Sequence, residues 1–135
     1  MKPEQAHQLA REFFAAIGRG DINDSLVTPD FRAWILTSGD IDLARFTGGI
    51  RALAAAVKGD LVYEISSLTA EDDRVVAEVR SDWELVNGQR AQNRHVFLFT
   101  LREGRVAAMS EYMDPVVPRE TLGPLIQQLM AQGQQ

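Results

Sequence analysis

One stretch near the carboxyl end, residues 93–114 (NRHVFLFTLREGRVAAMSEYMD), constrains the fold more than any other part of the chain. It predicts two strands joined by a tight turn at residues 102–105 (REGR). Side chains alternate along a strand, which places two sets on one face: Asn93, His95, Phe97 and Phe99 in the first strand, Met109, Glu111 and Met113 in the second. Buried polar groups are costly unless they are paired, so such a mixture is more typical of a cavity wall than of a solid core. The stretch therefore predicts a pocket lined by one face of a sheet.

The same residues carry a resemblance to a known family. An aromatic strand, an acid-Gly-Arg-aliphatic turn and a strand ending in Glu-Tyr-Met-Asp (residues 111–114) resemble the SnoaL-like branch of the nuclear transport factor two-like superfamily. That superfamily includes ketosteroid isomerase and limonene epoxide hydrolase, and the resemblance extends more weakly over nearly the whole chain. It implies a cone-shaped α+β barrel, in which a strongly curved antiparallel sheet wraps around amino-terminal helices. An internal blind pocket is implied between the first helix, the third helix and the sheet.

The order of the predicted elements agrees with a single α+β domain over residues 1–135. Helical spacing predicts a first helix over 3–18, and Asp21 is interpreted as the N-cap of a short second helix that ends at Pro29. A strand over 31–37 and a third helix that opens at 47–49 and closes at Gly59 follow. The pattern then changes to strands at 61–68 and 74–86, with Asn87-Gly88 as the strongest hairpin signal, and an amphipathic segment over 119–130 comes last.

Composition excludes several classes of function. The chain has no cysteine and two histidines, which excludes disulfides and thiolate metal sites and argues against a histidine zinc site. A formal net charge of −5 argues against nucleic-acid binding. No apolar run reaches the roughly 18 residues of a membrane span, and the polar amino terminus lacks the apolar core of a signal peptide. We expect a cytoplasmic protein with no metal, no other cofactor, no nucleic-acid partner and no membrane association.

Residues 74–86 leave two orientations open. Their odd-numbered face is mainly apolar, whereas their even-numbered face carries Glu78, Arg80, Asp82 and Glu84. Periodicity favours the apolar face packed against helices and the charged face in solvent. The resemblance implies the reverse, because matching the hairpin at 87–89 to that of ketosteroid isomerase turns the charged face toward the cavity. Under that orientation a homodimer forms through an apolar outer face made of Trp83, Leu85, Val96 and Leu98.

With the charged face inward, the resemblance implies an acid–base site. Arg80-Ser81-Asp82 matches the Arg-x-Asp motif of limonene epoxide hydrolase, and Glu111 matches the first acid of its last catalytic strand. In that family one carboxylate activates water, the other protonates the leaving oxygen, and the arginine orients both. Two enclosed acids repel, so the pKa of one rises while the pKa of the other stays low, which supplies an acid and a base together. A second hypothesis pairs His95 with Glu111 as a general base, the type of chemistry that SnoaL-type cyclases use.

Ketosteroid isomerase activity is not predicted, because its catalytic tyrosine, general base and oxyanion-hole acid fall on Phe13, near Ile35 and on Phe97. Trp34 remains open to either the pocket or the core. The candidate catalytic residues are Arg80, Asp82, His95 and Glu111. The candidate substrate-binding residues are Phe13, Trp34, Ile35, Glu78, Asn93, Phe97, Met109 and Met113. We therefore expect a cofactor-independent acid–base enzyme of hydrolase, cyclase or isomerase type that acts on a small apolar, oxygen-bearing molecule. The alternative is a non-catalytic module of the same fold that binds a small ligand or dimerises.

Overall fold

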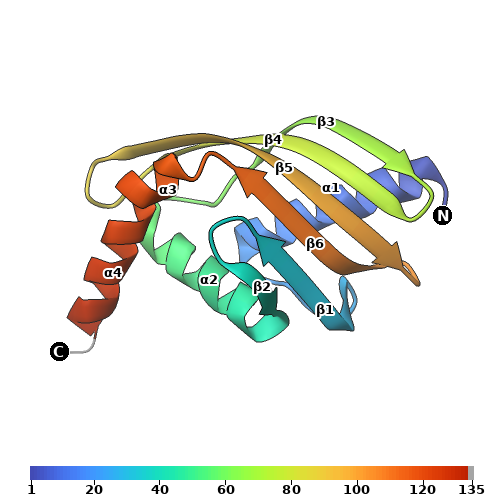
Figure 1. The fold of residues 1–135 in the computed structure, drawn as a ribbon, viewed down its shortest axis with the longest axis horizontal. Helices are drawn as coiled ribbons and strands as arrows, with labels where there is room; N and C mark the ends of the chain where they lie inside the picture. Colours follow the sequence, from blue (N-terminus) through green and yellow to red (C-terminus); the bar gives the residue numbers. More distant parts are fainter. Residues whose placement is uncertain (134–135) are drawn as a thin grey trace.

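The computed structural model describes residues 1–133 and confirms the α+β fold. Within these residues, four helices accompany one six-stranded sheet (Figure 1). The helices are α1 (Pro3–Arg19), α2 (Leu43–Ala56), α3 (Val116–Glu120) and α4 (Leu122–Gly133). The strands are β1 (Val27–Ile35), β2 (Gly39–Asp42), β3 (Glu64–Glu71), β4 (Arg74–Glu84), β5 (Arg90–Arg102) and β6 (Arg105–Met113). None of the helices within residues 1–133 is both long and apolar enough to cross a membrane.

The sheet is curved, but it is mixed and it does not close. Its order is β2-β1-β6-β5-β4-β3, so β2 and β3 are open edges. β1 pairs with β6 in parallel, while every other described pair is antiparallel. The parallel pair arises because the chain crosses from β2 through α2 to the opposite edge and returns by hairpins, so β6 is the last strand to arrive beside β1 (Figure 1). The structure thus refines the expected antiparallel barrel to an open, mixed sheet.

The segment between α1 and β3 differs most from the sequence prediction. The predicted short helix from Asp21 to Pro29 is wrong, because a turn at 24–26 leads directly into β1. Pro29 lies where the register of β1 against β6 shifts, an irregularity at which its missing N–H breaks no ladder hydrogen bond. α2 begins four residues before the predicted Thr47, since Asp42 caps the helix by accepting a 2.9 Å hydrogen bond from the Arg45 backbone N–H. The glycine pair at 48–49 therefore lies inside a helix.

Helix α1 covers one end of the inner face of the sheet. In Figure 1 it lies behind the sheet. The apolar positions predicted for this helix, among them Leu9, Phe13 and Ile17, are all buried. The Phe13 ring centroid lies 5.1 Å from that of Phe99, and the Phe14 centroid lies 4.9 Å from that of Phe97. Edge-to-face contacts of this kind add to the burial of large aromatic surfaces. This end of the inner face is a solid core.

Strand register decides which side chains face inward. In the β4–β5 pair, Ser81 lies opposite Asn93 and Val79 opposite His95, so residues of the same parity share a face. The odd-numbered residues of β4 are buried, and Glu78, Arg80 and Asp82 are exposed on the outer face. The orientation predicted from periodicity is confirmed, and the one implied by the resemblance is wrong. Trp83 and Leu85 are consequently core residues, not the outer dimer surface that was expected.

Candidate functional site

A pocket of about 600 Å³ lies at the end of the inner face beyond α1. Its sheet wall includes Ile35, Ser81, Trp83, Asn93, His95, Glu111 and Met113. Its helical walls come from α2 and from the α3–α4 segment, and include Phe46, Ile50, Leu53, Val117, Leu122 and Ile126. The expected contribution from the first helix is wrong, because α1 supplies none of the described lining residues. The volume falls in the range of roughly 300–1,000 Å³ that is usual for small-molecule sites.

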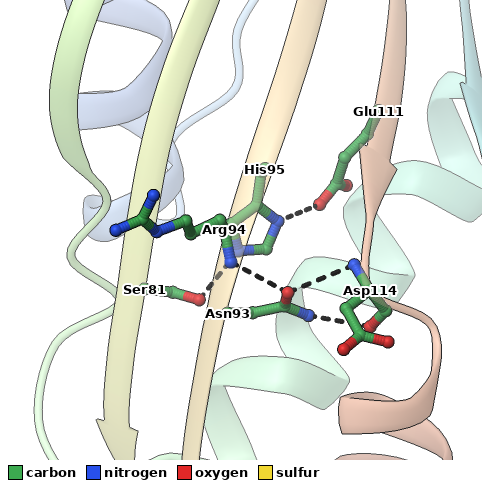
Figure 2. A network of polar contacts seen from close by, with 6 residues as sticks. All are labelled: Ser81, Asn93, Arg94, His95, Glu111 and Asp114. Carbon is green, nitrogen blue, oxygen red and sulfur yellow. Dashed lines mark hydrogen bonds and ion pairs between the residues drawn. The ribbon is translucent and has the colours of Figure 1, made fainter.

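Three polar side chains on adjacent strands form a hydrogen-bonded chain in the sheet wall (Figure 2). Ser81 Oγ lies 2.7 Å from His95 Nε2, and His95 Nδ1 lies 2.8 Å from Glu111 Oε2. The register explains why they meet: Ser81 lies opposite Asn93 and Glu111 opposite Phe97, so each is a diagonal neighbour of His95. Diagonal pairs across neighbouring strands are about 7–8 Å apart, within reach of long side chains.

All three side chains are buried as well as paired. The relative exposure is 4% for Ser81, 7% for His95 and 9% for Glu111. A carboxylate accepts hydrogen bonds but cannot donate them, so the imidazole nitrogen facing Glu111 carries the ring hydrogen. The other nitrogen, Nε2, is then an acceptor, and the Ser81 hydroxyl donates to it. The arrangement leaves an imidazole held in one tautomer at the wall of an apolar pocket.

Tyr63 packs its ring against this chain of polar groups. Its ring centroid lies 5.4 Å from that of His95, at an interplanar angle of 79°, and 5.3 Å from that of Trp83. Burial raises the pKa of the Tyr63 phenol well above its usual value, and the negative charge of Glu111 raises this pKa further. Tyr63 therefore presents a neutral hydroxyl, a hydrogen-bond donor, in the same pocket as His95.

The structure brings together two of the four predicted catalytic residues. His95 and Glu111 meet, whereas Arg80 and Asp82 lie on the outer face, away from the pocket just described. Asp82 accepts a 2.7 Å hydrogen bond from Arg90 Nε there. The hydrogen bond from Arg90, followed by one from Gln92, lowers the pKa of Asp82. The predicted placement of Arg80 and Asp82 beside Glu111 is wrong, because even-numbered residues of β4 lie on the opposite face of the sheet from His95.

The predicted substrate-binding residues divide into three groups. Ile35, Asn93 and Met113 line the pocket. Phe13, Phe97 and Met109 are buried core residues that do not line it. Trp34 and Glu78 lie on the outer face, where the Trp34 ring centroid is 5.1 Å from that of Tyr112. Neither alternative given for Trp34 is correct.

Asn93 lines the pocket, but its amide is committed to the end of β6 (Figure 2). Its Nδ2 donates to the Asp114 carbonyl oxygen at 3.0 Å, and its Oδ1 accepts from the Asp114 backbone N–H at 3.2 Å. The side chain therefore fixes the chain where it leaves the sheet toward α3. Among residues 1–133, no cluster of three or more His, Asp or Glu side chains is suited to hold a metal ion.

Two residues of the site were not among the candidates. Ser81 lies within the Arg80-Ser81-Asp82 motif, where the functional role is predicted for its charged neighbours. The signal that finds Ser81 is alternation, because odd-numbered residues of β4 share a face with His95. Tyr63 falls within the strand predicted over 61–68, where alternation places it on one face with Leu61 and Ile65. The structure begins β3 only at Glu64, but the burial of residues 61–65 still alternates, so this spacing is the signal that finds Tyr63.

Comparisons with known proteins show which family the chain matches and which solved structures share its fold. The family model described as the SnoaL-like domain matches residues 10–109. TsrD from Streptomyces laurentii has a similar structure (TM-score 0.75, 23% identity, 91% of this chain and 98% of that chain covered). AclR from Streptomyces galilaeus has a TM-score of 0.75 at 21% identity, with 91% of this chain and 83% of that chain covered.

A candidate SnoaL-like polyketide cyclase from Jannaschia sp. CCS1 is also similar (TM-score 0.73, 19% identity, 89% of this chain and 92% of that chain covered). At these identities the structural neighbours support the fold and not a reaction. A comparison with curated protein sequences finds no match.

Proposed function

This chain belongs to the SnoaL-like domain family, and we propose that it is an acid–base catalyst whose general base is His95. The observation that carries the proposal is the 2.8 Å contact between His95 Nδ1 and Glu111 at the wall of a largely apolar pocket. The substrate is a small apolar molecule that carries an oxygen function, and no cofactor takes part in the proton transfer.

Each side chain of the site has a role in the proposed reaction. His95 Nε2 takes a proton from the substrate, and the carboxylate of Glu111 stabilises the imidazolium that forms. The Ser81 hydroxyl, which occupies Nε2 in the free protein, rotates away or relays the proton. The neutral Tyr63 phenol donates a hydrogen bond to the substrate oxygen on which negative charge develops.

The walls of the pocket favour a carbon acid as substrate. Its helical sides are mainly aliphatic and aromatic, so a bound molecule exchanges water for apolar contacts. A carbon next to a carbonyl group loses its proton to an imidazole when the carbonyl oxygen is hydrogen-bonded. Such deprotonation starts aldol cyclisation, and the Jannaschia neighbour, a candidate polyketide cyclase, is consistent with that class.

A carbon-acid probe tests the proposal without knowledge of the natural substrate. Nitrobenzisoxazole loses one carbon-bound proton to a base and opens to a coloured cyanophenolate. We expect the protein to accelerate this reaction and His95→Asn to lower the rate by about 100-fold or more, the contribution typical of a general base. Glu111→Gln, which keeps the size of the side chain but not its charge, lowers the rate as well. A wild-type rate equal to that of His95→Asn would contradict the proposal.

The two adjacent glycines of α2 supply a matched pair for testing the pocket. Gly49 lines the pocket and Gly48 does not, and an added Cβ meets no atom within 4 Å at either position. Replacing either glycine by leucine favours the helix by about 0.5–1 kcal/mol. We expect Gly49→Leu to block the probe reaction and Gly48→Leu to leave it intact. Equal rates for the two variants would mean that the reaction takes place elsewhere.

A non-catalytic ligand-binding module is the second candidate. The observation in its favour is that both ring nitrogens of His95 already have partners, which satisfies a buried histidine without any reaction. This candidate predicts that an environment-sensitive apolar dye binds the wild type and His95→Asn equally, that Gly49→Leu prevents binding, and that no variant accelerates the carbon-acid reaction.

We also propose a homodimer, but through a different set of outer-face residues from the one predicted. With Trp83 and Leu85 in the core, the apolar residues of the outer face are Trp34, Val96, Leu98 and Tyr112. A second copy of the chain that covers this face would remove the neighbouring Trp34 and Tyr112 rings from water. Sedimentation velocity of the wild type and of Tyr112→Glu tests this: a dimer should become a monomer, and a monomeric wild type would rule the dimer out.

A further inference from the structure

We propose that Ser81 is a nucleophile and that Ser81, His95 and Glu111 together transfer acyl groups from small apolar carboxylic esters. The inference rests on the pocket and the His95–Glu111 pair of the proposed function, but it adds a covalent step that proton transfer alone does not require.

The geometry supplies the three relations that nucleophilic catalysis needs. The nucleophile is within hydrogen-bond reach of the base, with Ser81 Oγ 2.7 Å from His95 Nε2. The base is held by a carboxylate, with Nδ1 2.8 Å from Glu111 Oε2. The order is nucleophile, base and acid across β4, β5 and β6, and Figure 2 shows the chain of contacts. A nucleophile–base–carboxylate triad is recognised by these distances and roles, because the same arrangement occurs on unrelated folds.

The only other buried serine or threonine among residues 1–133, Thr28, shows the contrast. Thr28 donates a 2.7 Å hydrogen bond to Asp30, an exposed carboxylate, and none of the described pockets includes it. Thr28 has a carboxylate acceptor but no neighbouring imidazole, and none of the described pockets borders it. Ser81 has a base that is itself oriented, and it borders a hollow that admits a small molecule. A buried hydroxyl needs only one hydrogen-bond acceptor, as Thr28 has in Asp30. The oriented imidazole beside Ser81 goes beyond that requirement.

The reaction balances without any added reagent. Ser81 Oγ forms a bond to the ester carbonyl carbon while its proton passes to His95 Nε2. The tetrahedral intermediate expels the alcohol oxygen, which takes that proton and leaves as an alcohol. Water then attacks the acyl group on Ser81, gives a proton to Nε2, and releases a carboxylic acid as the proton returns to Ser81.

The rate of acyl transfer is limited by how few hydrogen-bond donors can stabilise the oxyanion of the tetrahedral intermediate. Backbone N–H groups in the middle of β4 and β5 pair within the ladder, so they cannot form the usual pair of oxyanion donors. Among the pocket residues, Trp83 Nε1 is committed to the Val62 carbonyl and the Asn93 amide to Asp114. Among the pocket-lining side chains that carry a donor without a described hydrogen-bond acceptor, Tyr63 is the one whose ring contacts His95. We expect turnover of activated esters, such as nitrophenyl esters, to exceed that of alkyl esters by a wide margin.

Covalent labelling tests the nucleophile directly. An alkyl fluorophosphonate loses fluoride to a reactive serine and leaves a stable phosphonate ester. We expect intact-mass measurement to show one adduct on the wild type, peptide mapping to place it on Ser81, and Ser81→Ala to prevent it. His95→Asn should slow the labelling by at least 100-fold, as expected for removal of the base. An adduct on another residue, or none, would overturn the inference.

A cysteine variant keeps the test decisive if Ser81→Ala does not fold. The chain contains no cysteine, so Ser81→Cys introduces a single thiol. A thiol beside an oriented imidazole reacts as a thiolate at lower pH than a free one. We expect iodoacetamide to modify Ser81→Cys faster at pH 7 than Ser67→Cys, a control on the exposed face of β3, and His95→Asn to remove the difference. Equal rates for the two cysteine variants would contradict an activated position at 81.

The carbon-acid reaction separates the two proposals. If the wild type accelerates it but acquires no label and shows no fast cysteine at 81, the nucleophile is excluded and the general base stands. If the label appears on Ser81 without carbon-acid activity, acyl transfer stands alone. Failure of both would leave a binding protein.

Discussion

Strands β4 and β5 present two unlike regions on one continuous face. At one end Val75, Ala77, Phe97 and Phe99 are buried beneath α1. At the other end, beyond the reach of α1, Ser81 and His95 line the pocket with Glu111 of β6. The strands are shared, so the difference lies in the side chains at each end and in the helices that cover them. Figure 1 shows α1 behind the sheet and α2 and α4 at its other end.

The contrast shows how a polar chain is accommodated in an otherwise apolar face. The α1 end is stable because large apolar side chains fill it. The pocket end has less apolar contact, and its polar groups are tolerated because each one has a partner. The two ends should therefore respond to different substitutions.

The largest effect is expected at the filled end. Phe99 is fully buried against Phe13, so Phe99→Ala removes aromatic packing and leaves a cavity. We expect the free energy of unfolding to fall by about 3–5 kcal/mol, measured by urea denaturation. Thr100→Ala, on the exposed face of the same strand, is the control and should change it by less than about 0.5 kcal/mol. Similar losses for both variants would mean that the face is not filled as described.

A smaller effect is expected from breaking the polar chain. Glu111→Ala leaves His95 Nδ1 buried without its acceptor, and we expect a loss of about 1–3 kcal/mol. Replacing all three partners at once, by Ser81→Ala, His95→Leu and Glu111→Leu, removes the unpaired groups and should recover most of that loss. Urea denaturation of both variants checks this. A triple variant less stable than Glu111→Ala would show that the polar chain itself stabilises the fold.

Alkaline pH tests the region between the two ends, where Tyr63 lies. Its folded-state pKa is raised above the unfolded value of about 10, so the folded protein holds this proton more tightly than the unfolded chain does. The resulting stability is complete below about pH 10 and is lost as the pH rises through the raised pKa. Thermal unfolding between pH 8 and 11 should show a steeper alkaline decline for the wild type than for Tyr63→Phe. Parallel curves would indicate a solvated phenol.

The smallest effect is expected on the outer face. Asp82 pairs with Arg90, and both side chains are more than half exposed, with relative exposures of 51% and 57%. The lowered pKa of Asp82 means that the pair stabilises the fold above the ordinary carboxyl range and ceases to do so as the pH falls through the folded pKa. Because solvent screens the pair, Asp82→Asn should leave the melting temperature at neutral pH within experimental scatter. A clear loss of carbon-acid activity in this variant would restore Asp82 to the catalytic site.

The sequence is sufficient for the fold class and for the meeting of His95 with Glu111, whose catalytic roles stay a prediction. The mixed composition of residues 93–114 indicated a pocket wall, and His95 and Glu111 are where alternation placed them. At β4 the orientation implied by the resemblance is wrong, and the one that periodicity predicts is confirmed. The parity of the β4–β5 pairing excludes the orientation implied by the resemblance, because Asp82 and His95 cannot then share a face.

Other features depended on contacts that no local pattern contains. The irregular pairing of β1 with β6 accommodates Pro29, and only the assembled sheet shows that this proline interrupts no helix. The diagonal approach of Ser81 to His95 needs the register of one pair of strands, and that of Glu111 needs the next. Tyr63 shares a face with Leu61 and Ile65 by alternation, but only the assembled strands show that this face meets His95.

Helix α4 has a consequence for how the pocket and the fold depend on each other. Leu122 and Ile126 of this helix form part of the wall, yet Leu125 is its only fully buried residue within the described part of the chain. It packs mainly on α2 and α3 (Figure 1). A segment with so little buried surface opens at a lower free energy than the sheet, and its amides should exchange with deuterium well before those of β5. Because Leu122 and Ile126 belong to the wall, a molecule bound in the pocket should slow the exchange of the α4 amides, which links occupancy of the pocket to the stability of the carboxyl-terminal helix.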